Sequence, residues 1–216
     1  MLGVGVKLEA TFTTGGEYLA DVAALEAAGA HSIWLDVSVG TSAEPWILLG
    51  AISAVTHRVR LGVMVDLGGG WPPALDLLGR LSGGRLAVGV HQSPNLQEHI
   101  ELLATTRSDA PAPTILIICD SYEEATRSLP VAGGFIFPGG GEDVPQLRAA
   151  GESEGNSETW VDIPIPKDRA AWARAIAAHA AAGATGILVP WDPRIIDLLR
   201  SAGEPDDRTD LLIATG

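Results

Sequence analysis

Residues 81–93 read LSGGRLAVGVHQS, in which two glycines, a short apolar run and an abrupt polar end follow one another. Gly83 and Gly84 end the helix that the preceding residues predict, and RLAVGV is typical of a buried strand. His91 follows at the point where the apolar run stops. A helix, a tight turn, a buried strand and a polar strand end in this order are typical of one repeat of an α/β fold.

The pentapeptide LSGGR invites comparison with the signature of ATP-binding-cassette ATPases. Those proteins also need a phosphate-binding GxxxxGK[ST] loop, and the chain contains no such pattern. They need a helix after the glycines as well, whereas RLAVGV predicts a strand. We therefore reject an ATPase.

The rest of the chain repeats the same order, because short apolar runs alternate with longer runs of helical spacing. Eight runs predict strands, and they span Val4–Ala10, Ser32–Val37, Val59–Val65, Arg85–Val90, Thr114–Cys119, Gly133–Phe137, Thr159–Ile165 and Gly186–Trp191. This alternation indicates parallel strands with right-handed crossovers. Eight units predict an α/β fold, a compact (β/α)8 TIM-type barrel with shortened loops, with an open doubly wound sheet as the alternative. No Pro/Ser-rich linker divides the chain, so we expect one domain over residues 1–216, with an acidic tail from about Gly203.

The composition is that of a globular protein with an acidic surface. Hydrophobic residues make up 46% and charged residues 19% of the 216 residues, which indicates a folded core. The 14 Lys+Arg against 27 Asp+Glu leave a net charge of -13, so nucleic acid and membrane surfaces are not expected as partners. No apolar run reaches the roughly 20 residues of a membrane helix, and the N-terminus lacks a secretory pattern. The single cysteine, Cys119, excludes a disulfide framework, and we expect a buried thiol in a cytoplasmic protein.

Side chains alternate along a strand, and in a closed barrel one set packs outward against the helices. The outward set of the first four strands is expected to be Val4, Val6, Leu8, Ile33, Leu35, Val37, Leu61, Val63, Val65, Leu86, Val88 and Val90. The same parity turns inward Lys7, Glu9, Trp34, Asp36, Met64, Asp66, Gly89 and His91. Asp120 ends the fifth strand, and Asp162 lies within the seventh.

Active sites of such barrels lie at the carboxyl ends of the strands, so we expect a small-molecule site there. The catalytic candidates are Lys7, Glu9, Asp36, Asp66 and His91. Crowded, buried carboxylates raise one another's pKa and so make general acids near neutral pH. His91 is suited to proton exchange, and Lys7 is expected to pair with Glu9 or Asp36.

A structural interpretation of each candidate stays open. Asp36 and Asp66 are also typical of loops that end strands, Lys7 and Glu9 of a structural ion pair, and His91 of an ordinary loop. No HxH, HExxH or similar spacing occurs, and we predict no metal site.

Three segments carry a resemblance to a known family: LEAAGAHSIWLDV (Leu25–Val37), EPWILLGAISAVTHRVRLGVMV (Glu44–Val65) and WPPALDLLGRLSGGRLAVGV (Trp71–Val90). In order and spacing the chain resembles the luciferase-like family of flavin- or F420-dependent monooxygenases and reductases. A weaker match continues from Pro113 to Gly140. The resemblance implies a (β/α)8 barrel and an oxidoreductase that acts on a small organic molecule. Two family features are missing: no histidine accompanies Asp36, and no long insertion follows the fourth strand.

The resemblance also implies FMN or F420 as a cofactor, with its ring across the barrel mouth near His91 and Asp36. Its phosphate is expected at the glycines Gly139 and Gly140 or at the helix start near Arg194, where backbone N–H groups can bind an anion. Trp34, expected near the mouth, is a candidate for stacking on the ring, with core packing as the alternative.

Other functions stay open. A barrel of the same ancestry without any cofactor would use its strand-end carboxylates for isomerisation, cyclisation, elimination or hydrolysis. A second alternative is a flavin- or ligand-binding protein without catalysis. The apolar helix PWILLGAISAV (45–55) is also suited to a homodimer interface, as the family's barrels often pair through helices near the second and third strands, with core burial of one face as the alternative.

Overall fold

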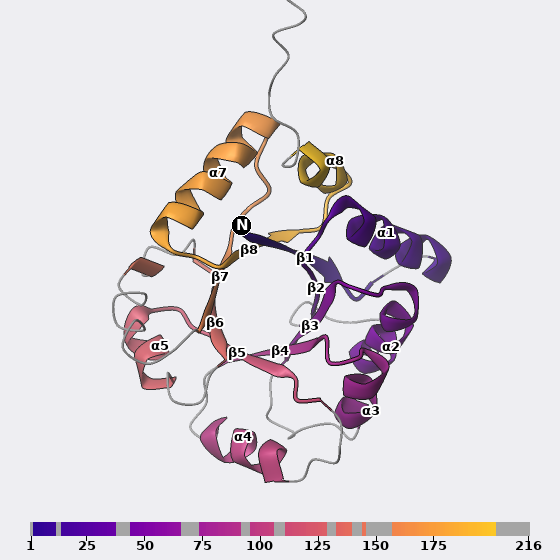
Figure 1. Cartoon of the computed structure of the whole chain (residues 1–216), viewed down its shortest axis with the longest axis vertical. Coiled ribbons are helices and arrows are strands. Elements are labelled where there is room, and N and C mark those ends of the chain that lie inside the picture. The colour runs from indigo at the N-terminus through magenta and orange to yellow at the C-terminus, as the bar shows by residue number, and fades with distance from the viewer. Residues whose placement is uncertain are drawn as a thin grey trace, which may run out of the picture.

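A computed structural model describes residues 2–11, 14–37, 44–65, 74–91, 96–105, 111–128, 133–139, 144–145 and 157–201. Eight parallel strands form a closed barrel in chain order, with the helices on its outside (Figure 1). The strands are β1 (Gly3–Glu9), β2 (Ser32–Asp36), β3 (Arg60–Val65), β4 (Leu86–His91), β5 (Thr114–Ile118), β6 (Gly134–Phe137), β7 (Glu158–Asp162) and β8 (Gly186–Pro190). The described helices are α1 (Gly15–Ala28), α2 (Pro45–Val55), α3 (Ala74–Leu81), α4 (Leu96–Thr105), α5 (Tyr122–Ser128), α7 (Arg169–Ala182) and α8 (Arg194–Ser201).

The pairing of the first strand with the last closes the sheet. Val4 of β1 lies opposite Ile187 of β8 in the parallel ladder, so the (β/α)8 prediction is confirmed and the open sheet is wrong. Predicted and observed strand bounds differ by a few residues. The largest difference is at β7, which ends at Asp162 rather than Ile165, because Pro164 and Pro166 have no N–H to donate.

The outward side chains of the strands and the inner faces of the helices make one core. Every residue that the alternation assigned to the outward set belongs to this core or packs against it, together with helix residues such as Leu25, Leu49 and Ile52. The predicted parity is therefore confirmed for the first four strands. Cys119 lies in the same core as a free thiol, and burial raises its pKa to about 12, which favours the neutral thiol over the reactive thiolate.

A second, separate cluster fills the barrel interior. It consists of Trp34, Ala87, Leu116, Ile118, Ile136, Trp160 and Leu188, with Met64 packed against it. The two indoles fit because glycines face them. A Cβ atom built on Gly62 would lie 2.2 Å from the Trp34 ring, and one on Gly186 would lie 2.4 Å from the Trp160 ring.

An ion pair lies at the amino-terminal end of the interior. The guanidinium of Arg60 on β3 donates to both oxygens of Glu158 on β7, at 2.5 and 2.8 Å, and Trp160 Nε1 donates to Glu158 Oε2 at 2.9 Å. Burial alone would raise the pKa of Glu158, but the hydrogen bonds from Arg60 and Trp160 outweigh it and lower that pKa. The bottom of the barrel is therefore filled with paired groups.

None of the described helices is long and apolar enough to cross a membrane.

The contact between Gly62 and Trp34 makes a direct test of this packing. We expect Gly62→Ala to lower the free energy of unfolding by about 1–3 kcal/mol, because the added methyl group overlaps the buried indole. Gly16→Ala is the matched control: nothing lies within 4 Å of its added Cβ in helix α1, and we expect a gain of about 0.4–1 kcal/mol. Urea denaturation of both variants measures the difference, and equal stabilities would contradict the packing described here.

Candidate functional site

The carboxyl ends of the strands surround a cavity of about 300 Å³, which we call the mouth pocket. Its floor is apolar and is made by Met64, Ile118 and Ile136, while its polar rim is made by Lys7, Asp36, His91 and Asp162. The other lining residues are Val37, Val65 and Pro138. An apolar cavity with a few convergent polar groups is the usual form of a small-molecule site.

An ion pair spans the rim between two strands that are not neighbours. The Lys7 ammonium on β1 donates to the Asp162 carboxylate on β7. The partner of Lys7 is thus Asp162 and not Glu9 or Asp36, the two partners expected from the sequence. The barrel register explains the difference, because Asp162 pairs with Leu188 of β8, which in turn pairs with Gly5, one inward position below Lys7. The lysine side chain therefore reaches across β8.

Burial raises the pKa of the Asp162 carboxyl above its ordinary value. Lys7 acts in the opposite direction through its hydrogen bond and its charge, and the nearby Asp36 carboxylate adds to the rise. The net result is a carboxyl group that holds its proton more tightly than a free aspartate does. The mouth thus contains a carboxyl, an ammonium, an imidazole and a second carboxylate around an apolar floor.

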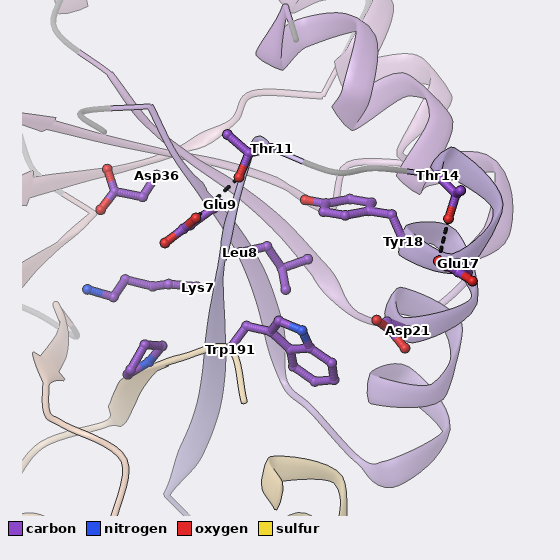
Figure 2. A pocket seen from close by; sticks show the side chains of 11 residues that line it. Lys7, Leu8, Glu9, Thr11, Thr14, Glu17, Tyr18, Asp21, Asp36 and Trp191 are labelled. Atoms are coloured by element: carbon purple, nitrogen blue, oxygen red, sulfur yellow. Dashed lines mark hydrogen bonds between the residues drawn. The ribbon is translucent and has the colours of Figure 1, made fainter. Parts of the chain in front are cut away.

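A second cavity of about 510 Å³ adjoins the mouth pocket, and we call it the α1 pocket. Figure 2 shows that lining side chains come from β1 and from helix α1 beside it, which carries Glu17, Tyr18 and Asp21. The lining residues are Lys7, Leu8, Glu9, Thr11, Thr14, Glu17, Tyr18, Asp21, Asp36, Pro190 and Trp191. Because Lys7 and Asp36 line both cavities, a molecule in one lies next to a molecule in the other.

Local sequence explains why α1 presents polar groups to this pocket. Thr14 precedes the first helical residue, and its hydroxyl donates to the Glu17 carboxylate one turn later. Tyr18 and Asp21 are three residues apart and share a face of the helix. Burial raises the pKa of the Tyr18 hydroxyl. The helix ends at Gly29, whose left-handed backbone (φ 98°) and N–H group cap the last turn.

Three of the predicted catalytic residues lie together in the structure. Lys7, Asp36 and His91 line the mouth pocket, with His91 exposed at the end of β4. Glu9 lies on the wall of the α1 pocket, where its carboxylate accepts a hydrogen bond from the Thr11 hydroxyl at 3.2 Å. Asp66 lies outside the described residues.

The predicted cofactor contacts are more scattered. Gly139 is exposed in the turn after β6, and Gly140 lies outside the described residues. Arg194 begins α8, and its donors are already bonded to Asp192. The Asp192 carboxylate accepts hydrogen bonds of 2.9 Å from the Arg194 backbone N–H, Nε and Nη2. An anion at this helix start would therefore compete with Asp192.

Trp34 lies in the barrel interior and not near the mouth, where it was expected. The indole is 0% exposed and its Nε1 donates to Ser32 Oγ at 2.9 Å. It fills the layer below the pocket floor, so the core-packing alternative describes its position and stacking on a cofactor does not fit its burial. Trp191, which follows β8, lines the α1 pocket.

Four pocket residues are not among the site residues predicted from the sequence, namely Thr14, Glu17, Tyr18 and Asp21. The available signal was the stretch TTGGEYLAD, where a Thr-x-x-Glu helix start comes directly after a strand that carries site candidates. This signal is weak, because acidic residues in a first helical turn are ordinary favourable partners of the helix dipole.

Comparisons with solved structures identify the fold class. An F420-dependent secondary alcohol dehydrogenase, solved with an F420–acetone adduct, is similar with a TM-score of 0.74 and 12% identity, over 93% of this chain and 97% of that chain. An EDTA monooxygenase from Chelativorans sp. BNC1 has a TM-score of 0.57 and 11% identity, over 84% and 66% of the two chains. Tryptophan synthase from M. tuberculosis has a TM-score of 0.64 and 15% identity, over 92% and 91%.

These similarities establish a (β/α)8 barrel, the fold that this chain shares with the alcohol dehydrogenase, the EDTA monooxygenase and tryptophan synthase. At these identities they extend to the fold alone, because one fold supports many chemistries. No family model matches the chain, and no curated protein matches it in sequence.

The charges around Asp162 predict opposite effects of two substitutions. We expect Lys7→Met to raise the pKa of Asp162 further, because the ammonium that favours its ionised form is removed. We expect Asp36→Asn to lower that pKa, because a like charge is removed. Carboxyl ¹³C titration by NMR measures both pKa values, and shifts in the same direction would contradict the arrangement.

Proposed function

We propose that the chain is a luciferase-like oxidoreductase that uses F420 or FMN and acts on a small organic molecule at the barrel mouth. The observation that carries the proposal is the mouth pocket itself, an apolar floor with a polar rim at the carboxyl ends of the strands. The barrel around it is similar over nearly the whole length of an F420-dependent alcohol dehydrogenase. The sequence resemblance between Leu25 and Val90 supports the same class.

The described residues fit the ring of such a cofactor better than its phosphate. Met64, Ile118 and Ile136 offer an apolar surface to a flat ring, and Pro138 lies beside them. The α1 pocket has an acidic wall that disfavours an anion. The remaining phosphate candidates are Gly139 and Gly140 and the Arg194 helix start, where Asp192 would have to give way.

A bound flavin or deazaflavin supplies the electron-accepting and hydride-transferring chemistry. The chain supplies the surrounding groups. His91 lies exposed at the rim, in a position to exchange a proton with a substrate oxygen or nitrogen. The hydrogen bond between Lys7 and Asp162 holds both side chains beside the floor. Asp36 lies between the two pockets, where it can orient a substrate that reaches from one to the other.

A second candidate function is acid–base catalysis without a cofactor: isomerisation, cyclisation, elimination or hydrolysis. The specific observation in its favour is Asp162, a carboxyl group with a raised pKa beside an ammonium and a second carboxylate. A raised pKa favours the protonated form of the carboxyl, which is the form that a general acid needs.

Cofactor titration separates the two candidates. We expect F420 or FMN to bind with a change in its visible absorbance or fluorescence, and we expect Met64→Glu to weaken binding at least about tenfold by placing a charge on the apolar floor. Glu98→Gln on α4 is the control, since this exposed carboxylate lines neither pocket. A protein that leaves both cofactor spectra unchanged at millimolar concentration would overturn the redox proposal and favour the acid–base one.

We also propose a homodimer that pairs through α2 and α3. These helices pack side by side and expose three large apolar side chains, Ile47 at 74%, Leu77 at 58% and Leu81 at 55%. A second copy of the chain would cover them.

The double variant Ile47→Glu/Leu77→Glu is expected to be a monomer under conditions where the wild-type protein is a dimer, because two charges would be buried at the interface. Ala177→Glu on the exposed side of α7 serves as the control and leaves the dimer intact. Sedimentation velocity measures the mass of each, and a wild-type monomer would dismiss the dimer.

A further inference from the structure

The α1 pocket carries a strong charge imbalance. Its wall includes four carboxylates, Glu9, Glu17, Asp21 and Asp36, against one ammonium, Lys7. That ammonium already pairs with Asp162 on the mouth side. A ligand in the α1 pocket therefore meets a net negative surface.

Aromatic rings line the same cavity. Tyr18 extends from α1, and Trp191 follows β8, so the two rings come from different elements (Figure 2). The backbone N–H of Trp191 donates to the Lys7 carbonyl oxygen at 2.8 Å, which fixes the start of this segment to β1. The faces of tyrosine and tryptophan rings attract cations. The carboxylates and the aromatic rings of this pocket therefore both favour a positively charged ligand.

The size and the spacing of the groups favour an organic ligand over a metal ion. The cavity of about 510 Å³ has the dimensions of a small-molecule site. Among the residues that the structure describes, no three His, Cys, Asp or Glu side chains converge closely enough to hold a metal ion. An organic ammonium needs no such convergence, because its charge is spread over a bulky group.

We propose that the substrate is an organic cation, an amine or quaternary ammonium compound whose charged nitrogen lies in the α1 pocket while its remaining part reaches the mouth pocket. This inference rests on the proposed function, because it names the substrate class of the same site. The shared residues Lys7 and Asp36 place the two ends of such a molecule on either side of one junction. The α1 pocket thereby selects the substrate and leaves the mouth to the reacting end.

Matched probes test the charge requirement directly. Choline and 3,3-dimethylbutan-1-ol have the same shape and differ in a charged nitrogen against a neutral carbon, and benzylammonium and benzyl alcohol make a second such pair. We expect each cation to bind at least about tenfold more tightly than its neutral partner, as measured by calorimetry and saturation-transfer NMR. The preference should shrink in high salt, since exposed charges are screened.

Variants on α1 locate the effect. Glu17→Gln/Asp21→Asn should weaken cation binding about three- to tenfold and leave the neutral probes unchanged, whereas Glu98→Gln should change neither. Trp191→Leu should also reduce the preference for the cation. Thermal melting confirms that each variant is folded, and the salt dependence of the wild-type protein supplies a readout that needs no variant.

The inference is overturned if each cation binds no more tightly than its neutral partner, or if neither probe of a pair binds. The failure of the proposed function is read separately in the cofactor titration. Cation selectivity without any cofactor binding supports the α1 pocket as a cation site and removes the redox chemistry. Cofactor binding without cation selectivity supports the redox function and overturns the α1 pocket as a cation site.

Discussion

The packing of two indole rings against glycines inside the barrel decides which end of the cylinder can hold a ligand. Trp34 and Trp160 occupy the middle layer because Gly62 and Gly186 leave room for them. Below this layer, Arg60 and Glu158 pair across the barrel. The interior is thus filled from the amino-terminal end upward, and the mouth pocket begins where the indole layer stops.

The two ends of the barrel also differ in the pKa of their carboxyl groups. At the amino-terminal end the carboxylate of Glu158 is held by a guanidinium and an indole N–H, and its pKa is lowered. At the carboxyl end burial wins over the single ammonium, and the pKa of Asp162 is raised. The carboxyl at the bottom of the barrel therefore has a pKa below its ordinary value, whereas the carboxyl at the mouth has a pKa above it. This contrast supports the proposal that the carboxyl end is the reactive one, because shifted pKa values cluster at functional sites and barrel active sites lie at that end.

Much of this could be predicted from the sequence because it depends on local patterns. The β-then-α alternation predicted the barrel, and strand parity placed Lys7, Asp36 and His91 on the inside. The Lys7–Asp162 pair could not be predicted, because it depends on how the closed barrel staggers β7 against β1. Parity alone also says nothing of depth, so Trp34 was expected near the mouth although it lies one layer lower. The contribution of α1 to the pocket could not be predicted from the sequence, because the position of a helix relative to the mouth depends on the tertiary fold.

The central claim is that small molecules bind at the mouth above the indole layer. Methyl NMR of the protein labelled at Met and Ile tests it most directly, during titration with F420, FMN or benzylammonium. The account predicts that the methyl signals of Met64, Ile118 and Ile136 shift, while those of Ile33, Ile52 and Ile187 in the outer core stay in place. Shifts confined to the outer core, or no shift at the three floor residues with a ligand that binds, would contradict it.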